Sequence, residues 1–148
     1  MENKDVKVLI FSINNQEYAT DITEVERIIG YEEPTKLPDS PIFVTGVITY
    51  EGNILPVLSL SKKFNLPYNE NINEAKIVVA KQDNTKIGII VDVVSEVKDV
   101  NGKNIETPPE IVAGISRRYI KGLIKLDKKI IIFLNLSTIL SEEEKKLI

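Results

Sequence analysis

The 148-residue chain contains no histidine and no cysteine. Without these residues it cannot form a Ser-His-Asp or Cys-His nucleophilic site, a zinc site with nitrogen and sulfur ligands, a disulfide or a redox dithiol. It also has no histidine that could accept a phosphoryl group. We therefore expect no catalytic residues, no metal site and no cofactor. An enzyme that used carboxylates and lysines stays open as the least supported class of function.

Long apolar segments are also missing. No apolar run reaches eighteen residues. The apolar start from Val8 to Ile13 is too short and too rich in β-branched residues for a secretory signal. The sequence therefore predicts a cytoplasmic protein without direct membrane contact.

Basic residues are too few for a nucleic-acid partner. The chain has 19 Lys and Arg against 22 Asp and Glu, which leaves a net charge of −3. This balance does not supply the cations that neutralise phosphates and drive nucleic-acid binding. Arg117 and Arg118 stand next to Tyr119, but two arginines do not change the conclusion. We interpret them as loop charges or a minor partner contact.

The composition is otherwise that of a globular protein, with 43% hydrophobic and 28% charged residues. Ile, Val and Thr account for 45 of the 148 residues, and their branched side chains favour strands over helices. The fold class is therefore predicted to be mostly β. Ten short strands are expected, at residues 6–13, 18–19, 25–31, 47–50, 54–58, 77–81, 87–91, 97–100, 120–125 and 130–134.

Helical signals are sparse. Residues 21–25 and 61–65 have room for one helical turn each, the first because Thr23 and Glu26 have the spacing of a capping box. The best helix is the C-terminal segment 137–148, with Ser137 or Ser141 as its N-cap. We interpret it as a packing helix and its charged tract, residues 142–146, as a solvated face.

The sequence contains an internal repeat. Residues 46–61 align with residues 122–137 without a gap, at an offset of 76, and residues 8–28 align with residues 77–97 at an offset of 69. The second copy is therefore seven residues longer, and we place the extra residues within 106–121.

Each copy can supply five strands, which is the content of a small SH3-like barrel. We therefore expect a single domain, residues 1–148, made of two SH3-like five-stranded β-barrel subdomains side by side. The first covers about residues 8–66 and the second about 76–136, joined by a linker rich in Asn, Pro and Glu at about 67–75. The groove between two such barrels is a natural place for a partner.

The repeat also contains the segment that carries a family resemblance. Residues 43–60, Phe-Val-Thr-Gly-Val-Ile-Thr-Tyr-Glu-Gly-Asn-Ile-Leu-Pro-Val-Leu-Ser-Leu, resemble the signature segment of the CheW family of bacterial chemotaxis coupling proteins. Matches extend over about residues 6–140 and include Tyr18 to Val25 with Ile28, Leu37-Pro38, Gly88 to Val94 with Val97, and Tyr119 to Leu123.

This resemblance implies a non-enzymatic adaptor that joins the cytoplasmic tips of chemoreceptors to the histidine kinase CheA. It also implies two SH3-like barrels, the first of which pairs with the regulatory domain of the kinase. A chain without histidine fits this role, since the phosphoryl chemistry belongs to the partner. The alternative is a two-barrel ligand- or oligonucleotide-binding module, which would need an exposed aromatic and basic face, whereas aromatic residues are only 6% of the chain.

By the resemblance, Gly46, Glu51, Gly52 and Asn53 match positions at the kinase interface. The alternative interpretation of the two glycines is turn chemistry, because a tight hairpin needs residues that tolerate positive φ. The two interpretations are compatible.

The resemblance places Val25 among the residues that face the receptor. Ile28 shares its strand, and Val94 and Val97 are the repeat equivalents of these two. All four could line a slot that receives a receptor helix tip. The alternative is burial in the core, which is the commoner fate of Val and Ile.

Two charges differ from the family pattern together. Most relatives carry Arg at the position of Glu51 and Glu at the position of Arg27, so both signs are reversed here. A paired reversal preserves an ion pair, because the Coulomb energy does not depend on which side carries which charge. We therefore predict contact between Arg27 and Glu51. Thr49 and Ser59 also replace the usual Asn and Asp, which weakens any transfer of polar contacts.

Overall fold

The computed structural model describes residues 4–65, 75–82, 84–108 and 119–146. The expected linker at 67–75 falls almost entirely outside this range. Arg117 and Arg118 lie outside it, as does most of the segment expected to hold the seven extra residues.

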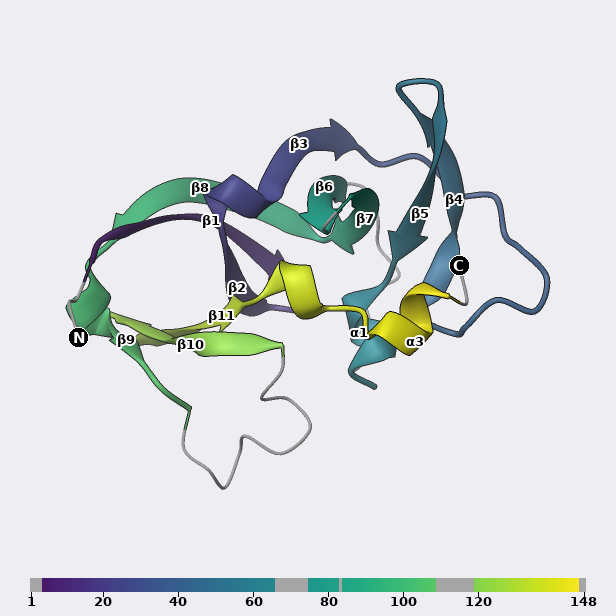
Figure 1. Ribbon diagram of the computed structural model, residues 1–148. Coiled ribbons are helices and arrows are strands. Elements are labelled where there is room, and N and C mark those ends of the chain that lie inside the picture. Colours follow the sequence, from purple (N-terminus) through teal and green to yellow (C-terminus); the bar gives the residue numbers. More distant parts are fainter. Residues whose placement is uncertain (1–3, 66–74, 83, 109–118, 147–148) are drawn as a thin grey trace.

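The described strands form two sheets, which lie side by side in Figure 1. The six-stranded sheet has the order β8-β1-β2-β11-β10-β9 and consists of β1 (Val6–Ile13), β2 (Gln16–Asp21), β8 (Val93–Val100), β9 (Ile105–Glu106), β10 (Ile120–Leu126) and β11 (Lys129–Leu134). The five-stranded sheet has the order β3-β6-β7-β5-β4 and consists of β3 (Val25–Gly30), β4 (Val44–Tyr50), β5 (Asn53–Leu58), β6 (Lys76–Gln82) and β7 (Thr85–Val91). The mostly β prediction is confirmed.

Each sheet combines strands from both copies of the repeat. The first two strands of one copy pair with the last strands of the other, through parallel contacts of β7 with β5 and of β2 with β11. Gly88 lies opposite Val57 in one contact, and Ala19 lies opposite Phe133 in the other, so the offsets of 69 and 76 are both kept. The two sheets therefore do not follow the expected division into residues 8–66 and 76–136.

Irregularities in the strands follow the same repeat. The pairing of β3 with β6 skips Glu26, and the pairing of β8 with β1 skips the equivalent Ser95. The pairing of β4 with β5 skips Thr45, and that of β10 with β11 skips the equivalent Lys121. Bulges bend strands locally, so both sheets have strand bends at equivalent positions.

The expected barrels are not found. In the described part of the chain, hydrogen-bonded pairing runs from one edge of each sheet to the other and does not close. The open edges are β3 and β4 in one sheet, and β8 and β9 in the other. β3 and β4 are consecutive in sequence but lie at opposite edges of their sheet, joined by residues 31–43. This connection adds only an isolated bridge from Thr35 to Val47.

Helices are short. The turn η1 (Ile22–Glu24) begins at Asp21, whose side chain accepts a hydrogen bond from the Thr23 N–H, so the capping spacing of Thr23 and Glu26 is not used. The turn α1 (Leu60–Lys63) begins at Ser59, and η2 (Gly102–Asn104) begins at Asn101.

The C-terminal helix expected over 137–148 is formed only in part: it does not run on from Ser137, whereas Ser141, the other expected N-cap, does start a helical turn. The segment forms a 3₁₀ turn, η4 (Leu136–Thr138), and a separate turn, α3 (Glu142–Lys145). Between them Ile139 and Leu140 are buried. Ser141 then starts α3 with a reciprocal capping box: its hydroxyl accepts from the Glu144 N–H, while the Glu144 carboxylate accepts from the Ser141 N–H. Burial and a strong N-cap thus interrupt the helix.

The core has three parts, one between the sheets and one on the far face of each. β1 shows how they are built, because Leu9 and Phe11 enter the central cluster while Val8 and Ile10 enter the cluster of the six-stranded sheet. The equivalent β6 does the same with Val78 and its neighbours, so β1 and β6 are buried on both faces. Among the described residues, no helix has the length and apolar character needed to cross a membrane.

The exchange of strands predicts that neither half folds alone. Fragments 1–66 and 75–148 should each give amide NMR spectra of an unfolded chain, because each would lack strands that complete its sheets. Mixing them should restore the dispersed spectrum of the intact protein. A folded spectrum from either fragment by itself would contradict the prediction.

Candidate protein-interaction surfaces

The hairpin that joins β4 to β5 turns through Glu51 and Gly52. Their φ angles are 49° and 79°, so both central residues lie in the left-handed region. A two-residue hairpin with this geometry matches the twist of the strands, and glycine adopts it without a steric penalty. The turn chemistry expected of Gly52 is therefore present, and it holds the tip of the hairpin in one shape.

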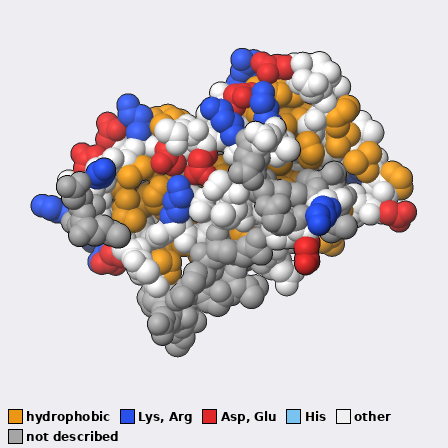
Figure 2. All heavy atoms as spheres, viewed as in Figure 1, with side chains coloured by type: hydrophobic (Ala, Val, Ile, Leu, Met, Phe, Trp, Pro, Cys, Tyr) orange, Lys and Arg blue, Asp and Glu red, His pale blue; other side chains and the backbone are white. Residues whose placement is uncertain are grey.

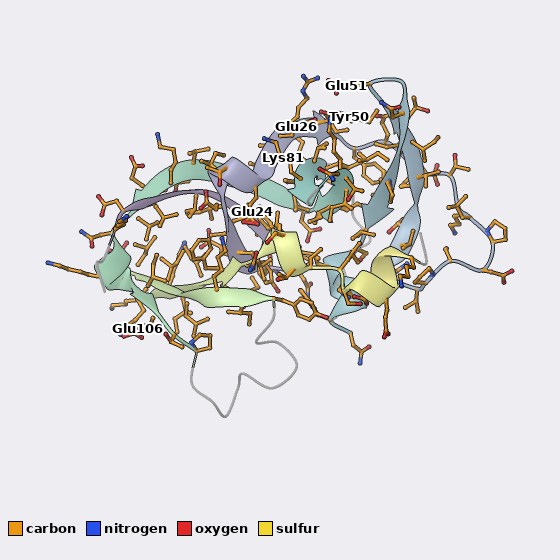
Figure 3. All side chains as sticks on the ribbon, in the orientation of Figure 1. Glu24, Glu26, Tyr50, Glu51, Lys81 and Glu106 are labelled. Atoms are coloured by element: carbon orange, nitrogen blue, oxygen red, sulfur yellow. The ribbon has the colours of Figure 1, made fainter. Side chains whose placement is uncertain are left out.

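A cluster of polar side chains surrounds the turn of this hairpin. We call Glu26, Arg27, Tyr50, Glu51 and Lys86 the ionic cluster. Glu26 Oε2 accepts a hydrogen bond of 2.7 Å from the Tyr50 hydroxyl and lies 3.0 Å from Lys86 Nζ. Arg27 Nη2 lies 3.5 Å from Glu51 Oε2, which is the contact that the paired reversal of charge predicts. Figure 3 shows Glu26, Tyr50 and Glu51 gathered there, with Lys81 nearby.

The contacts within the cluster shift the pKa values of Glu26, Tyr50 and Lys86. The hydrogen bond from Tyr50, together with Lys86, holds the pKa of Glu26 below its ordinary value. The same bond raises the pKa of Tyr50, and the bond to Glu26 raises the pKa of Lys86. Each shift favours the protonation state that the group has near neutral pH. Glu26 and Lys86 therefore stay charged there, and Tyr50 stays neutral. Figure 2 shows acidic and basic side chains side by side over this part of the molecule, next to hydrophobic ones.

A groove of about 530 Å³ runs beside the hairpin, and we call it the hairpin groove. Its apolar lining consists of Ile54, Leu55, Pro56, Ile87 and Leu140, and Tyr50, Glu51 and Lys86 of the ionic cluster form its polar side. Ile54, two residues after Gly52 of the turn, is 69% exposed. An exposed isoleucine beside an apolar groove is a surface on which a partner can bury area.

The equivalent place on the other sheet has a different character. A second groove, of about 450 Å³, lies beside the hairpin that joins β10 to β11. Its lining includes Asn15, Gln16, Glu17, Lys129 and Ile130, and the first three are equivalent to Asn84, Thr85 and Lys86. The two grooves thus lie at equivalent places in the two copies of the repeat, but only the hairpin groove has a mainly apolar lining.

Gly46 lies in β4, opposite Val57 and away from the hairpin turn, and it packs against another segment of this chain. A Cβ atom built on Gly46 would lie 2.8 Å from the carbonyl carbon of Thr35 and 2.9 Å from Cβ of Pro34. The absent side chain therefore admits the chain's own segment, which forms the bridge from Thr35 to Val47. Gly122, its repeat equivalent, admits Ile105 and Glu106 of β9 in the same way.

The four candidate receptor residues occupy equivalent positions on the edge strands β3 and β8. Val25 and Ile28 lie opposite Ala80 and Val78. Val94 and Val97 lie opposite Phe11 and Leu9. Since all of these partners belong to the central cluster, the four side chains share the face turned toward it.

Exposure divides these four residues into two pairs. Val25 and Val94 are partly buried against the central cluster, whereas Ile28 is 38% and Val97 51% exposed.

Glu24, just before β3, accepts a hydrogen bond of 2.9 Å from the Ser137 N–H and lies 3.3 Å from Lys121 Nζ. This carboxylate ties the start of β3 to the other sheet.

Comparison with known proteins places this architecture in a family. The family model described as CheW-like domain matches residues 7–144. The chain belongs to the CheW family. That match covers both sheets, the hairpin groove and the edge strands.

Individual CheW proteins match over nearly their whole length. The chain is 33% identical to the chemotaxis protein CheW of Klebsiella aerogenes, over 95% of this chain and 84% of that one. It is 29% identical to the Bacillus subtilis protein of the same name, over 95% and 90%. The crystal structure of the scaffolding protein TtCheW from Thermoanaerobacter tengcongensis superposes with a TM-score of 0.87 at 31% identity, over 97% of each chain.

Several residues of these CheW surfaces were not among the sequence-based candidates. Ile54, Lys86 and Leu140 line the hairpin groove, and Glu24 links the sheets. Ile54 gave a usable signal, because strand alternation places it on the face opposite the buried Leu55 and Val57. Lys86 and Leu140 come from distant parts of the sequence, so only the fold brings them to the groove.

The ionic cluster predicts coupling between Arg27 and Glu51. Arg27→Glu alone should lower stability, because it places a carboxylate beside Glu51, and adding Glu51→Arg should restore it. The coupling should be about 1 kcal/mol or less, as for other exposed pairs, and should shrink in high salt. Urea denaturation of the double-mutant cycle measures it. A double variant less stable than both single variants would contradict the contact.

The close approach at Gly46 predicts a structural role. Gly46→Ala should lower the free energy of unfolding by about 1–3 kcal/mol, the usual cost of overpacking, because the new methyl overlaps the Thr35 backbone. Gly30→Ala is the matched control, since a Cβ there has no neighbour within 4 Å. Chemical denaturation compares the two. Equal stability of both variants would show that the segment around Thr35 yields without cost.

Proposed function

We propose that this protein is a non-enzymatic adaptor that couples the cytoplasmic tips of chemoreceptors to the histidine kinase CheA in bacterial chemotaxis. Membership of the CheW family supports the proposal, and the relatives are named as chemotaxis proteins or as a scaffolding protein. The observation that carries it is the hairpin groove, which offers a protein partner an apolar surface beside a rigid turn. Such an adaptor acts in the cytoplasm.

The kinase side of the adaptor is the hairpin between β4 and β5. Glu51, Gly52 and Asn53 form its tip, Ile54 lines the groove beside it, and Gly46 lies in β4 where the segment around Thr35 packs against the hairpin. Buried apolar anchors provide most of the binding energy of such interfaces, while charges at the rim select the partner. Ile54 is accordingly the anchor, and the ionic cluster provides selectivity toward the kinase regulatory domain.

The receptor side is formed by the edge strands. Ile28 and Val97 expose apolar side chains at the border of the central cluster, with Val25 and Val94 packed behind them. A receptor tip is a helical hairpin, and a helix binds an apolar slot through a few anchor residues. The adaptor thus holds its two partners on different surfaces of one rigid body.

The kinase surface is tested by Ile54→Asp. Binding to the isolated kinase regulatory domain, measured by calorimetry, should weaken at least about tenfold, because the partner would bury an unpaired charge. Ile130→Asp is the matched control, since Ile130 is 56% exposed at the equivalent position of the other hairpin. It should bind within about twofold of the original protein. Equal losses in both variants, or in neither, would contradict the assignment.

The receptor surface is tested by comparing exposed with packed positions. Ile28→Asp and Val97→Asp should keep the melting temperature but lose binding to a receptor tip fragment. Val25→Asp and Val94→Asp should lower the melting temperature, since each puts a charge against the central cluster. Pull-down and thermal melting together separate the two effects. Full receptor binding by the Ile28 and Val97 variants would remove these strands from the proposal.

A further inference from the structure

A lysine is enclosed in the junction between α1 and the C-terminal segment. The side chain of Lys63, in α1, is only 4% exposed. Its Nζ lies 2.6 Å from Glu144 Oε2 in α3. A buried ammonium group is costly unless it is paired and well surrounded, so this position is specific to a cation.

Two aromatic rings complete the enclosure. Lys63 Nζ lies 4.5 Å from the ring centre of Phe43, just before β4, and 5.2 Å from that of Tyr119, just before β10. The backbone of both aromatic residues is fixed by hydrogen bonds, since the Ser59 N–H donates to the Phe43 carbonyl and the Asn135 N–H donates to the Tyr119 carbonyl. The faces of such rings attract cations, so one ammonium group joins segments from both sheets.

Glu144 transmits this anchor to α3. One of its carboxylate oxygens contacts Lys63, while the other accepts from the Ser141 N–H in the capping box. The side chain thus both starts the helical turn and attaches it to α1. In Figure 1, α3 lies beside α1 at the end of a C-terminal segment that has crossed from the six-stranded sheet.

The residue before this capping box is part of the hairpin groove. Leu140 precedes Ser141, is buried in the central cluster and also lines the groove. The C-terminal segment therefore leaves the core at Leu140. If α3 loosened, Leu140 would be the first residue of the groove lining to move.

We propose that Lys63 is a positioning residue for the hairpin groove: by holding Glu144, it fixes α3 and keeps Leu140 in place as part of the groove lining. The effect on kinase binding rests on the proposed function, whereas the effect on the C-terminal segment does not. Lys63 itself is absent from the groove lining and acts through the segment that it holds.

The test combines amide hydrogen exchange of the free protein with binding to the kinase regulatory domain. Lys63→Met removes the charge, Lys63→Arg keeps it, and Glu144→Gln removes the partner charge. Lys125→Met is the matched control, because Lys125 and Glu106 form an exposed pair at 3.7 Å on the other sheet. Exchange is read at residues 136–144 and, as a reference for global unfolding, at β6.

For Lys63→Met and Glu144→Gln we expect exchange at residues 136–144 to accelerate about tenfold or more, with β6 unchanged, because a broken buried pair is far more costly than an exposed one. Kinase binding should weaken about three- to tenfold. Lys63→Arg should remain close to the original protein in both measurements, since it retains a cation between the rings. Lys125→Met should change neither.

Other outcomes separate the claims. Unchanged exchange in both variants that lose the pair would overturn the proposal. So would faster exchange with undiminished kinase binding, provided that Ile54→Asp does weaken binding. If Ile54→Asp has no effect, the proposed kinase surface fails, and the exchange data alone decide whether Lys63 holds the C-terminal segment. Should Lys63→Met also accelerate β6, Glu144→Gln decides, because Glu144 is 24% exposed and its loss leaves less of the core disturbed.

Discussion

Two short parallel pairings, β5 with β7 and β11 with β2, hold together strands from opposite halves of the sequence. They bring the hairpin between β4 and β5 next to the turn between β6 and β7, and the hairpin groove lies between them. They also leave β3 and β8 as edges, with their apolar side chains turned toward the central cluster. Both proposed partner surfaces therefore exist only because the two copies exchange strands.

The repeat preserves the backbone more faithfully than the surface. The bulges, the parallel pairings and the close approaches at Gly46 and Gly122 all occur twice. The side chains around the two hairpins differ, since the ionic cluster and the apolar groove accompany only one of them. Packing on both faces of the sheets constrains the backbone geometry. Exposed side chains are less constrained, so their residue types can differ between the two copies and serve different functions.

Much of this structure could be predicted from sequence, for physical reasons that differ between features. The strands follow from β-branched residues, and the repeat offsets recur in the pairing registers. The contact of Arg27 with Glu51 followed from a paired reversal of sign. The exchange of strands between the copies could not be predicted, because the two copies have similar sequences and a strand could pair equally well within its own copy or with the other. The C-terminal helix does not extend from Ser137 as predicted, because burial of Ile139 and Leu140 outweighs the local preference for a helix.

The interaction surfaces were accessible from sequence only in part. Glu51, Gly52 and Asn53 lie in one turn, so a local motif identified them together. Leu140 and Lys86 reach the groove from distant segments, and Lys63 contacts Phe43, Tyr119 and Glu144, which come from three other segments. Such meetings depend on sheet order, which no local pattern encodes.

The exchange of strands also has a consequence for how the chain is made. Neither sheet can be completed during synthesis from its N-terminal half, because the five-stranded sheet waits for β7 and the six-stranded sheet waits for β11. The first five strands therefore leave the ribosome with apolar faces that have no permanent partner. During synthesis, apolar strand faces of this chain therefore stay without their final partners until the last strand emerges.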